Sequence, residues 1–157
     1  MITGVYGSTI SSYLTLEEKR IHTAVDASKV RYLFKFTNDL TKTVKYSYGR
    51  KVSTNERYIK NDFLHHTTES VLDFTINFKP YGFWKYEVYE VSWLGTVAIE
   101  VGNAPLTETQ ILSVHNDNGV VQGKVEEGKL YVQETAGSEQ IKYTKHTTTE
   151  TNYLYTN

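Results

Sequence analysis

The sequence predicts an all-β fold, either a single antiparallel β-sandwich or a flattened barrel, with little helix. Tyr, Phe and Thr are abundant, at 13, 6 and 21 of 157 residues, and such side chains favour pleated, half-buried strands. Apolar residues also alternate with polar ones in several short runs divided by turn signals, as in sandwiches and barrels. No amphipathic helix lies between these runs, which argues against a βαβ arrangement.

Residues 30–48 predict a β-hairpin. Alternate residues of its first arm share an apolar face: Val30, Tyr32, Phe34 and Phe36. The second arm repeats this pattern with Val44, Tyr46 and Tyr48. The link at residues 38–40 contains Asn38 and Asp39, which favour tight turns.

Residues 72–79 show the clearest alternation in the chain, and Pro80-Tyr81-Gly82 then interrupts it. A new apolar face begins at Trp84, so we expect a second hairpin with the proline at its turn. The shared parity of these runs predicts eight buried residues: Phe34, Phe36, Phe74, Ile76, Phe78, Trp84, Tyr86 and Val88.

Shorter strands are expected elsewhere in the chain. They fall at residues 10–16, at residues 55–66, around Leu130 and Val132, and around Ile141 and Tyr143. The only helix candidates, residues 16–25 and 106–114, are rich in Thr or β-branched residues. No linker divides the chain, so we predict one β-sandwich domain over residues 1–146, followed by a strand-prone arm over residues 147–157.

Composition excludes several classes of function. The net charge is −1, so the overall charge does not favour binding to nucleic acid or to an anionic membrane. We expect no sequence-specific nucleic-acid binding. The chain has no Cys, which removes disulfides, thiolate metal sites and Cys nucleophiles and suits a reducing cytoplasm. We also expect no transmembrane helix and no signal peptide, because no long apolar run is present.

Motifs that carry chemistry are weak. His65 and His66 with Glu69 suggest metal ligands, but adjacent residues of a strand face opposite sides. The run Asn116-Asp117-Asn118-Gly119 is more typical of a turn than of a calcium loop. Strand carboxylates are ordinary on a solvated face: Glu87, Glu90, Glu100, Glu126 and Glu127. We therefore expect no enzymatic activity, no catalytic residue, no metal and no cofactor.

Trp84 and Trp93 raise the possibility of a stacking platform for a sugar. Trp84 shares the parity of Tyr86 and Val88 and is expected in the core. Trp93 has the opposite parity, so we expect it to be exposed and to contribute to an interface.

Three stretches resemble a known set of proteins when taken in order: YLFKFTND at residues 32–39, GFWKYEVYE at 82–90 and VEEGKLYV at 125–132. They look like small β-sandwich proteins encoded among the virion structural genes of tailed bacteriophages, including crAss-like phages. The resemblance spans about residues 30–135, and its motifs are structural. It implies a virion component of the neck, tail or capsid-associated parts, made in the host bacterial cytoplasm and working with other virion proteins.

The arm at residues 147–157 carries one charged residue, Glu150, together with Tyr153, Leu154 and Tyr155. Strand propensity and apolar groups favour docking on a neighbouring protein, with a frayed terminus as the alternative. We therefore expect a non-enzymatic virion subunit that forms a homo-oligomer. The alternative function is a carbohydrate- or receptor-binding module, and an enzyme ranks third.

Overall fold

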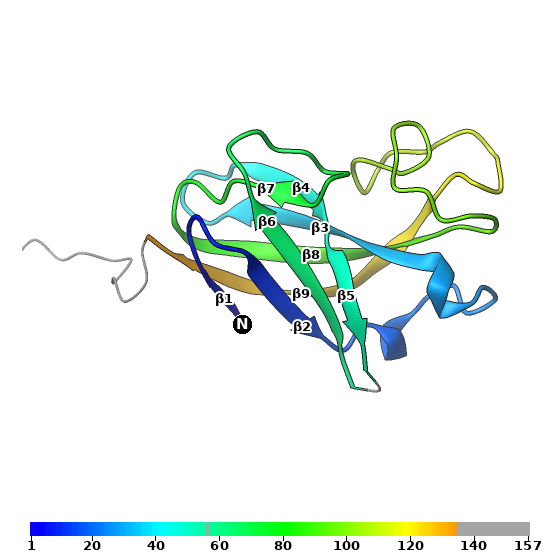
Figure 1. Cartoon of the computed structure of the whole chain (residues 1–157), viewed down its shortest axis with the longest axis horizontal. Coiled ribbons are helices and arrows are strands. Elements are labelled where there is room, and N and C mark those ends of the chain that lie inside the picture. The colour runs from blue at the N-terminus through cyan, green and yellow to red at the C-terminus, as the bar shows by residue number, and fades with distance from the viewer. Residues whose placement is uncertain (56, 135–157) are drawn as a thin grey trace, which may run out of the picture.

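The computed structural model describes residues 1–55 and 57–134. Over these residues the chain forms two β-sheets that pack face to face (Figure 1). This confirms the predicted all-β sandwich. The sheets are mixed rather than purely antiparallel, because β1 pairs with β9 and β6 pairs with β7 in parallel.

The larger sheet has five strands, in the order β1-β9-β8-β3-β4. Their bounds are Ile2–Val5, Val120–Gln133, Gly82–Ser92, Val30–Asn38 and Val44–Tyr48. The smaller sheet has the order β2-β6-β5, and β7 pairs with β6 beside it. The bounds of β2, β5, β6 and β7 are Ile10–Leu14, Arg50–Thr54, Ile59–His65 and Thr75–Ile76. The antiparallel pairing of β3 with β4 confirms the first predicted hairpin.

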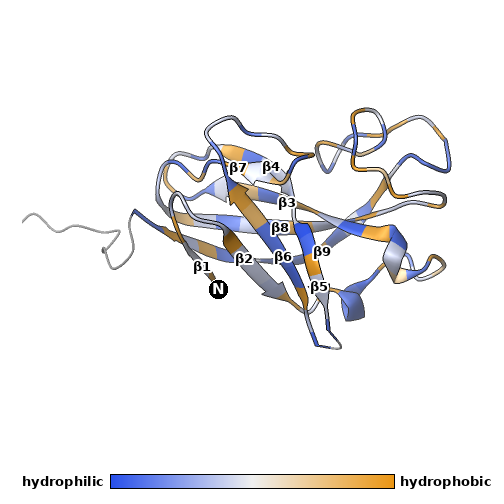
Figure 2. Cartoon of the chain, in the orientation of Figure 1, coloured by the Kyte–Doolittle hydropathy of each residue, from blue (hydrophilic) through white to orange (hydrophobic). Residues whose placement is uncertain are grey.

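The main core lies between the two sheets. Alternate residues of β3 and β8 point into it, as their apolar parity predicts, and hydrophobic and hydrophilic residues alternate along these strands in Figure 2. An aromatic cluster forms its centre, with edge-to-face contacts that join Phe36 to Phe63 and Phe78, and Phe78 to Trp84. Seven of the eight residues predicted to be buried are buried, and Phe74 is only partly so.

The predicted strand at residues 72–79 is wrong in most of its length, since only Thr75–Ile76 is extended and paired. Phe74 has a φ of 62°, a left-handed conformation that interrupts a strand. The second predicted hairpin is also wrong, because β3 and β9 occupy both edges of β8. The alternating run instead divides between two cores: Ile76 and Phe78 enter the main one, whereas Leu72 and Phe74 pack on the outer face of the larger sheet.

Neither helix candidate forms an α-helix. Within residues 16–25 only the 3-10 turn η1 (Glu17–Lys19) forms, since the amides of Ile21 and His22 donate to the Glu90 carboxylate instead of to helix carbonyls. In residues 106–114 the Leu106 amide donates to the Gln110 side chain. The other 3-10 turn in the described residues, η2 (Ala27–Lys29), is capped by Asp26. Side-chain acceptors thus replace helical hydrogen bonds in both segments.

Phe78 is buried and Phe74 is only partly buried, so replacing each by Ala should lower the free energy of unfolding by different amounts. Phe78→Ala should lower the free energy of unfolding by about 3–5 kcal/mol, as for a fully buried aromatic residue. Phe74→Ala should cost clearly less, because Phe74 is partly exposed. Urea unfolding of both variants measures this, with Ile111→Ala as a control at a 93% exposed site. Equal losses for Phe74 and Phe78 would contradict the division of the run between two cores.

Candidate interaction surfaces

The outer face of the larger sheet carries a second apolar cluster. Its buried members are Leu33, Tyr48, Val91, Trp93 and Ala104. Partly buried apolar residues from two loops, residues 66–74 and 94–119, cover this cluster. We call these two loops the roof.

The prediction that Trp93 is exposed is wrong, because its side chain is fully buried beneath the roof. Its parity did place it on the outer face, opposite Trp84, but that face is covered. The indole Nε1 donates to the Asn103 carbonyl at 3.2 Å. A Cβ on Gly119 would lie 2.7 Å from the indole ring, so the returning loop can pass here only because it has glycine. Trp93 therefore presents no surface to a partner.

Hydrogen bonds from the sheet fix the roof in place. The hydroxyl of Tyr48 donates to the Pro105 carbonyl at 2.6 Å, and burial raises the pKa of this tyrosine. Glu108 accepts from the Lys35 ammonium at 2.6 Å and from the Tyr46 hydroxyl at 2.6 Å. The 94–119 loop is therefore attached to both β3 and β4.

The charge on Glu108 follows from these contacts. Burial alone would raise the pKa of its carboxyl, but the hydrogen bonds from Lys35 and Tyr46 outweigh burial and hold the pKa below its ordinary value. The hydrogen bond to Glu108 raises the pKa of Lys35. Burial and the same carboxylate raise the pKa of Tyr46 to about 12. Glu108 is thus an ionised anchor of the roof.

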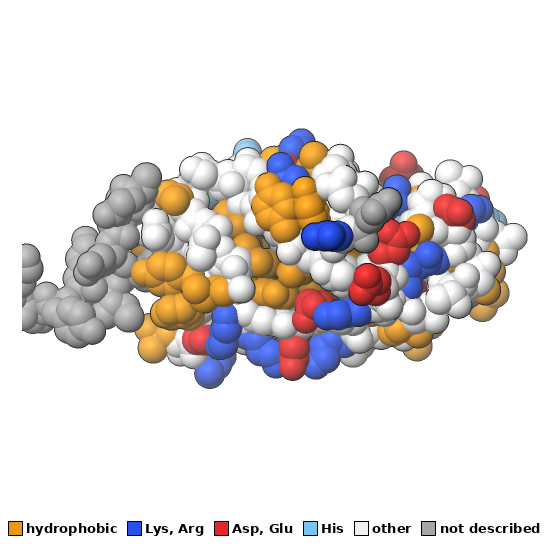
Figure 3. Space-filling model, turned by 90° about the horizontal axis from the view of Figure 1, so that it is seen from below, with side chains coloured by type: hydrophobic (Ala, Val, Ile, Leu, Met, Phe, Trp, Pro, Cys, Tyr) orange, Lys and Arg blue, Asp and Glu red, His pale blue; other side chains and the backbone are white. Residues whose placement is uncertain are grey.

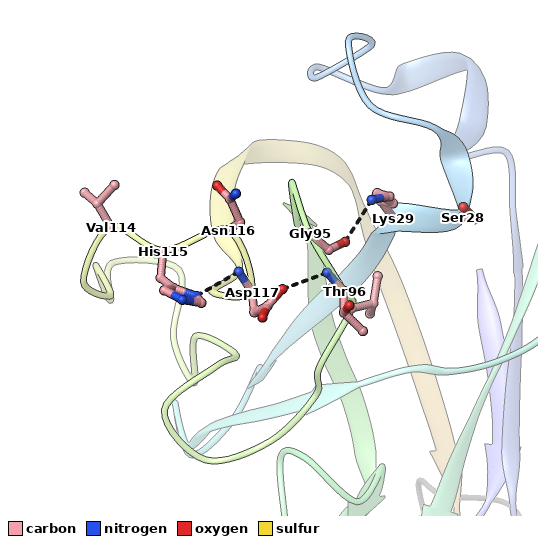
Figure 4. A pocket seen from close by; sticks show the side chains of 9 residues that line it. Ser28, Lys29, Gly95, Thr96, Val114, His115, Asn116 and Asp117 are labelled. Atoms are coloured by element: carbon pink, nitrogen blue, oxygen red, sulfur yellow. Dashed lines mark hydrogen bonds between the residues drawn. The ribbon is translucent and has the colours of Figure 1, made fainter.

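A shallow polar pocket of about 850 Å³ lies where the roof meets η2 (Figure 4). The Lys29 ammonium donates to the Leu94 and Gly95 carbonyls at 3.0 and 2.9 Å. Asp117 accepts from the Thr96 amide at 2.9 Å, and its own amide donates to Nδ1 of His115 at 3.1 Å. These polar groups satisfy one another. Residues 116–118 form the expected turn.

The histidine and acidic residues considered as metal ligands do not come together. The ring of His65 lies edge-on to Tyr6, with centroids 4.7 Å apart. Nδ1 of His66 accepts from the Thr68 amide, and Glu69 accepts from Lys45. Across residues 1–55 and 57–134, no group of three His, Cys, Asp or Glu side chains is placed to hold a metal ion.

Among the strand carboxylates, Glu90 departs from the solvated state expected for it. It lies on the inner face of β8, is fully buried and accepts from the Ile21 amide at 2.6 Å and the His22 amide at 3.0 Å. Beside it, Nδ1 of His22 lies 3.0 Å from the hydroxyl of Ser92. Glu90 shares the parity of Trp84 and Val88, and this was the signal that it would face inward. It ties residues 16–25 to the end of the sandwich.

The other strand carboxylates pair with surface lysines. Glu87 lies within 4 Å of Lys35, Lys85 and Lys124, and Glu127 accepts from Lys124 at 2.9 Å. Glu126 accepts from Lys19 of η1. The contacts of Glu87 and Glu127 form a ladder of alternating charge on the outer surface of β3, β8 and β9, whereas Glu126 lies opposite Val88, on the other side of the sheet.

An apolar pocket of about 560 Å³ lies at the opposite end of the larger sheet from the roof loop 94–119. Two segments line it: residues 38–40, where the chain turns from β3 toward β4, and residues 80–83, where the chain enters β8. We call it the end pocket. The side chains of Leu40 and Phe83 are exposed beside it, and the Phe83 ring lies 4.7 Å from that of Tyr131. The sequence predicted a turn at residues 38–40 and a break at residues 80–82, but nothing in it indicated that these two segments meet.

The remaining predicted interface residues, Tyr153, Leu154 and Tyr155, lie outside the described residues, as do the arm and the strand expected around Ile141 and Tyr143. Within the described residues, none of the helical turns has the length and apolar character needed to cross a membrane. Comparison with known proteins finds no matching family model, no matching curated protein and no matching solved structure.

The Glu108 anchor predicts a pH dependence. Because its folded pKa lies below the unfolded one, its stabilising effect should be complete above the unfolded value and lost as pH falls through the folded value. Glu108→Gln should therefore lower the free energy of unfolding by about 1 kcal/mol at neutral pH, the usual size for a partly exposed ion pair. The difference in free energy of unfolding from the parent protein should shrink as the pH falls below 4.5, the ordinary pKa of Glu.

Urea unfolding at several pH values measures this effect. Glu100→Gln is the matched control, because Glu100 is exposed and also lies in the roof loop. A Glu108→Gln deficit that does not change with pH would mean that lost packing, rather than lost charge, causes it.

Proposed function

We propose that this chain is a non-enzymatic structural subunit of a bacteriophage virion, in a neck or tail ring or a capsid-associated assembly. One observation carries the proposal. The three stretches that resemble phage virion proteins fall on β3, β8 and β9, which lie side by side in the larger sheet. The resemblance therefore follows one contiguous structural unit, although its parts are far apart in the sequence.

The arrangement of strand edges supports a role in assembly. Among the described residues, the outermost strands are β1 and β4 in the larger sheet and β2 and β5 in the smaller one. β5 is an exposed edge with Val52 48% accessible. Unpaired edges accept strands from neighbours through main-chain hydrogen bonds. Repeated contacts of this kind between copies close a ring when they are head-to-tail and cyclic.

The arm provides the test of this proposal. A variant that lacks residues 147–157 should fold as the full chain does, because the described core lies within residues 2–132. It should nevertheless fail to enter particles, since the arm is the segment that we propose docks on a neighbouring subunit. Phage propagated with the truncated gene, followed by mass spectrometry of purified virions, measures incorporation.

A full-length variant in which Thr147, Thr148 and Thr149 are changed to Ser is the matched control, because it keeps Tyr153, Leu154 and Tyr155. Unchanged incorporation of the truncated chain would place the interface on the strand edges or loops. Absence of the full-length chain from virions would refute the proposed function itself. Electron microscopy of the purified full-length protein adds a direct search for rings.

The second candidate, a carbohydrate- or receptor-binding module, is favoured by an exposed aromatic pair. Tyr13 and Tyr58 are 57% and 36% accessible, with ring centroids 5.4 Å apart, and the Lys60 ammonium lies 5.7 Å from the Tyr13 ring. Aromatic rings with a nearby polar group are suited to sugar recognition. If this function holds, glycan-array binding should be lost in Tyr13→Ala and kept in a Leu94→Ala control at another exposed site.

A further inference from the structure

The end pocket has walls that are held in place by hydrogen bonds. The side-chain oxygen of Asn38 accepts from the amides of Leu40 and Thr41 at 3.0 and 2.9 Å, which shapes the first turn. The Trp84 indole donates to the Pro80 carbonyl at 3.1 Å, which fixes the segment at residues 80–83. The Asp39 amide donates to the Phe83 carbonyl at 3.0 Å and joins this segment to the turn at residues 38–40. The pocket is therefore preformed.

The end pocket also exposes apolar surface to water. Leu40 is 88% accessible and Phe83 is 41% accessible, and both line the same hollow. Figure 3 shows hydrophobic side chains gathered at the end of the molecule where β9 stops. Single exposed apolar residues are common on proteins, but a group around one preformed hollow gains free energy when it is covered.

The chain itself supplies a segment that can reach this pocket. Val132 of β9 pairs with Gly82, which lines the pocket, and Glu134, the last described residue, follows two positions later. Residues 135–146 could span up to about 40 Å when extended. The segment beyond them, residues 147–157, contains Tyr153, Leu154 and Tyr155 and has Glu150 as its only charge.

We propose that in the free chain the segment 147–157 folds back, and that Tyr153, Leu154 and Tyr155 cover the end pocket of their own molecule. The tether favours this occupant over a second copy. A short linker gives an effective concentration in the millimolar range, which exceeds the concentration of free copies in a dilute solution. This inference concerns the isolated chain and does not depend on the proposed virion function.

Paramagnetic labelling tests the proposal directly. The chain has no Cys, so Thr156→Cys allows one nitroxide to be attached beside the aromatic residues. At about 50 µM protein, far below the effective concentration of a tethered segment, the amide signals of residues 38–40 and 81–83 should lose most of their intensity. Leu40→Asp should restore these signals, because it puts a charge into the apolar hollow at a site too exposed to matter for folding.

Two controls keep this test decisive. Ile111→Asp places the same charge at a 93% exposed site in the roof loop, at the other end of the molecule, and should leave the signal loss unchanged. Replacing Tyr153 and Tyr155 together by Ser removes the occupant without touching the pocket, and should restore the signals as Leu40→Asp does.

Three results would overturn the proposal. The first is full intensity at residues 38–40 and 81–83 in the labelled parent chain. The second is signal loss that persists in Leu40→Asp, since the segment would then dock elsewhere. The third uses a mixture of two chains, one that carries the nitroxide and one that is isotope-enriched but carries no nitroxide. If the signals of the isotope-enriched chain are lost in this mixture and return on dilution, the segment that covers the pocket comes from a second copy.

Discussion

The pairing of β3 with β8 is the constraint on which the rest of the structure depends. All nine residues of β3 pair with β8, from Val30 opposite Ser92 to Asn38 opposite Trp84. This ribbon buries apolar side chains on both faces, with Phe34 and Val88 toward the smaller sheet and Leu33 and Val91 beneath the roof. A shift of the pairing register by one residue would move the side chains of one face of the strand to the other face. Both layers packed on the ribbon therefore rely on its register.

Alternation in the sequence predicted the strands of this ribbon and their inner face well, because side-chain parity is a local property of a strand. It failed where the outcome depends on distant segments. Trp93 was placed on the correct face, yet no local pattern indicated that residues 94–119 return to cover it. The run at residues 72–79 alternates cleanly, but both edges of β8 were already occupied, and Phe74 turns the chain. Glu90 was treated as a surface carboxylate although its parity pointed inward.

The end pocket shows the same limit for interaction sites. The turn at residues 38–40 and the break at residues 80–82 were predicted from Asn, Asp, Pro and Gly, which is local turn chemistry. They meet only because Asn38 lies opposite Trp84 at the end of the β3–β8 ribbon. Leu40 was assigned to a polar link, and its exposure beside Phe83 follows from that long-range register. The register of the central ribbon thus sets the position of the pocket as well as the two cores.

The proposed docking of residues 147–157 in the free chain and the proposed role of the same segment in a virion are compatible. An element that covers a pocket of its own molecule can make the same contacts with a neighbour, as in domain swapping, because the contacting residues are identical. The contact then contributes nearly the same free energy in the free chain and in the assembly. Additional contacts at the strand edges of β4 and β5 would therefore decide whether the segment moves from its own molecule to a neighbour. Covering Leu40 and Phe83 until a neighbour is present would also limit premature association through this apolar hollow.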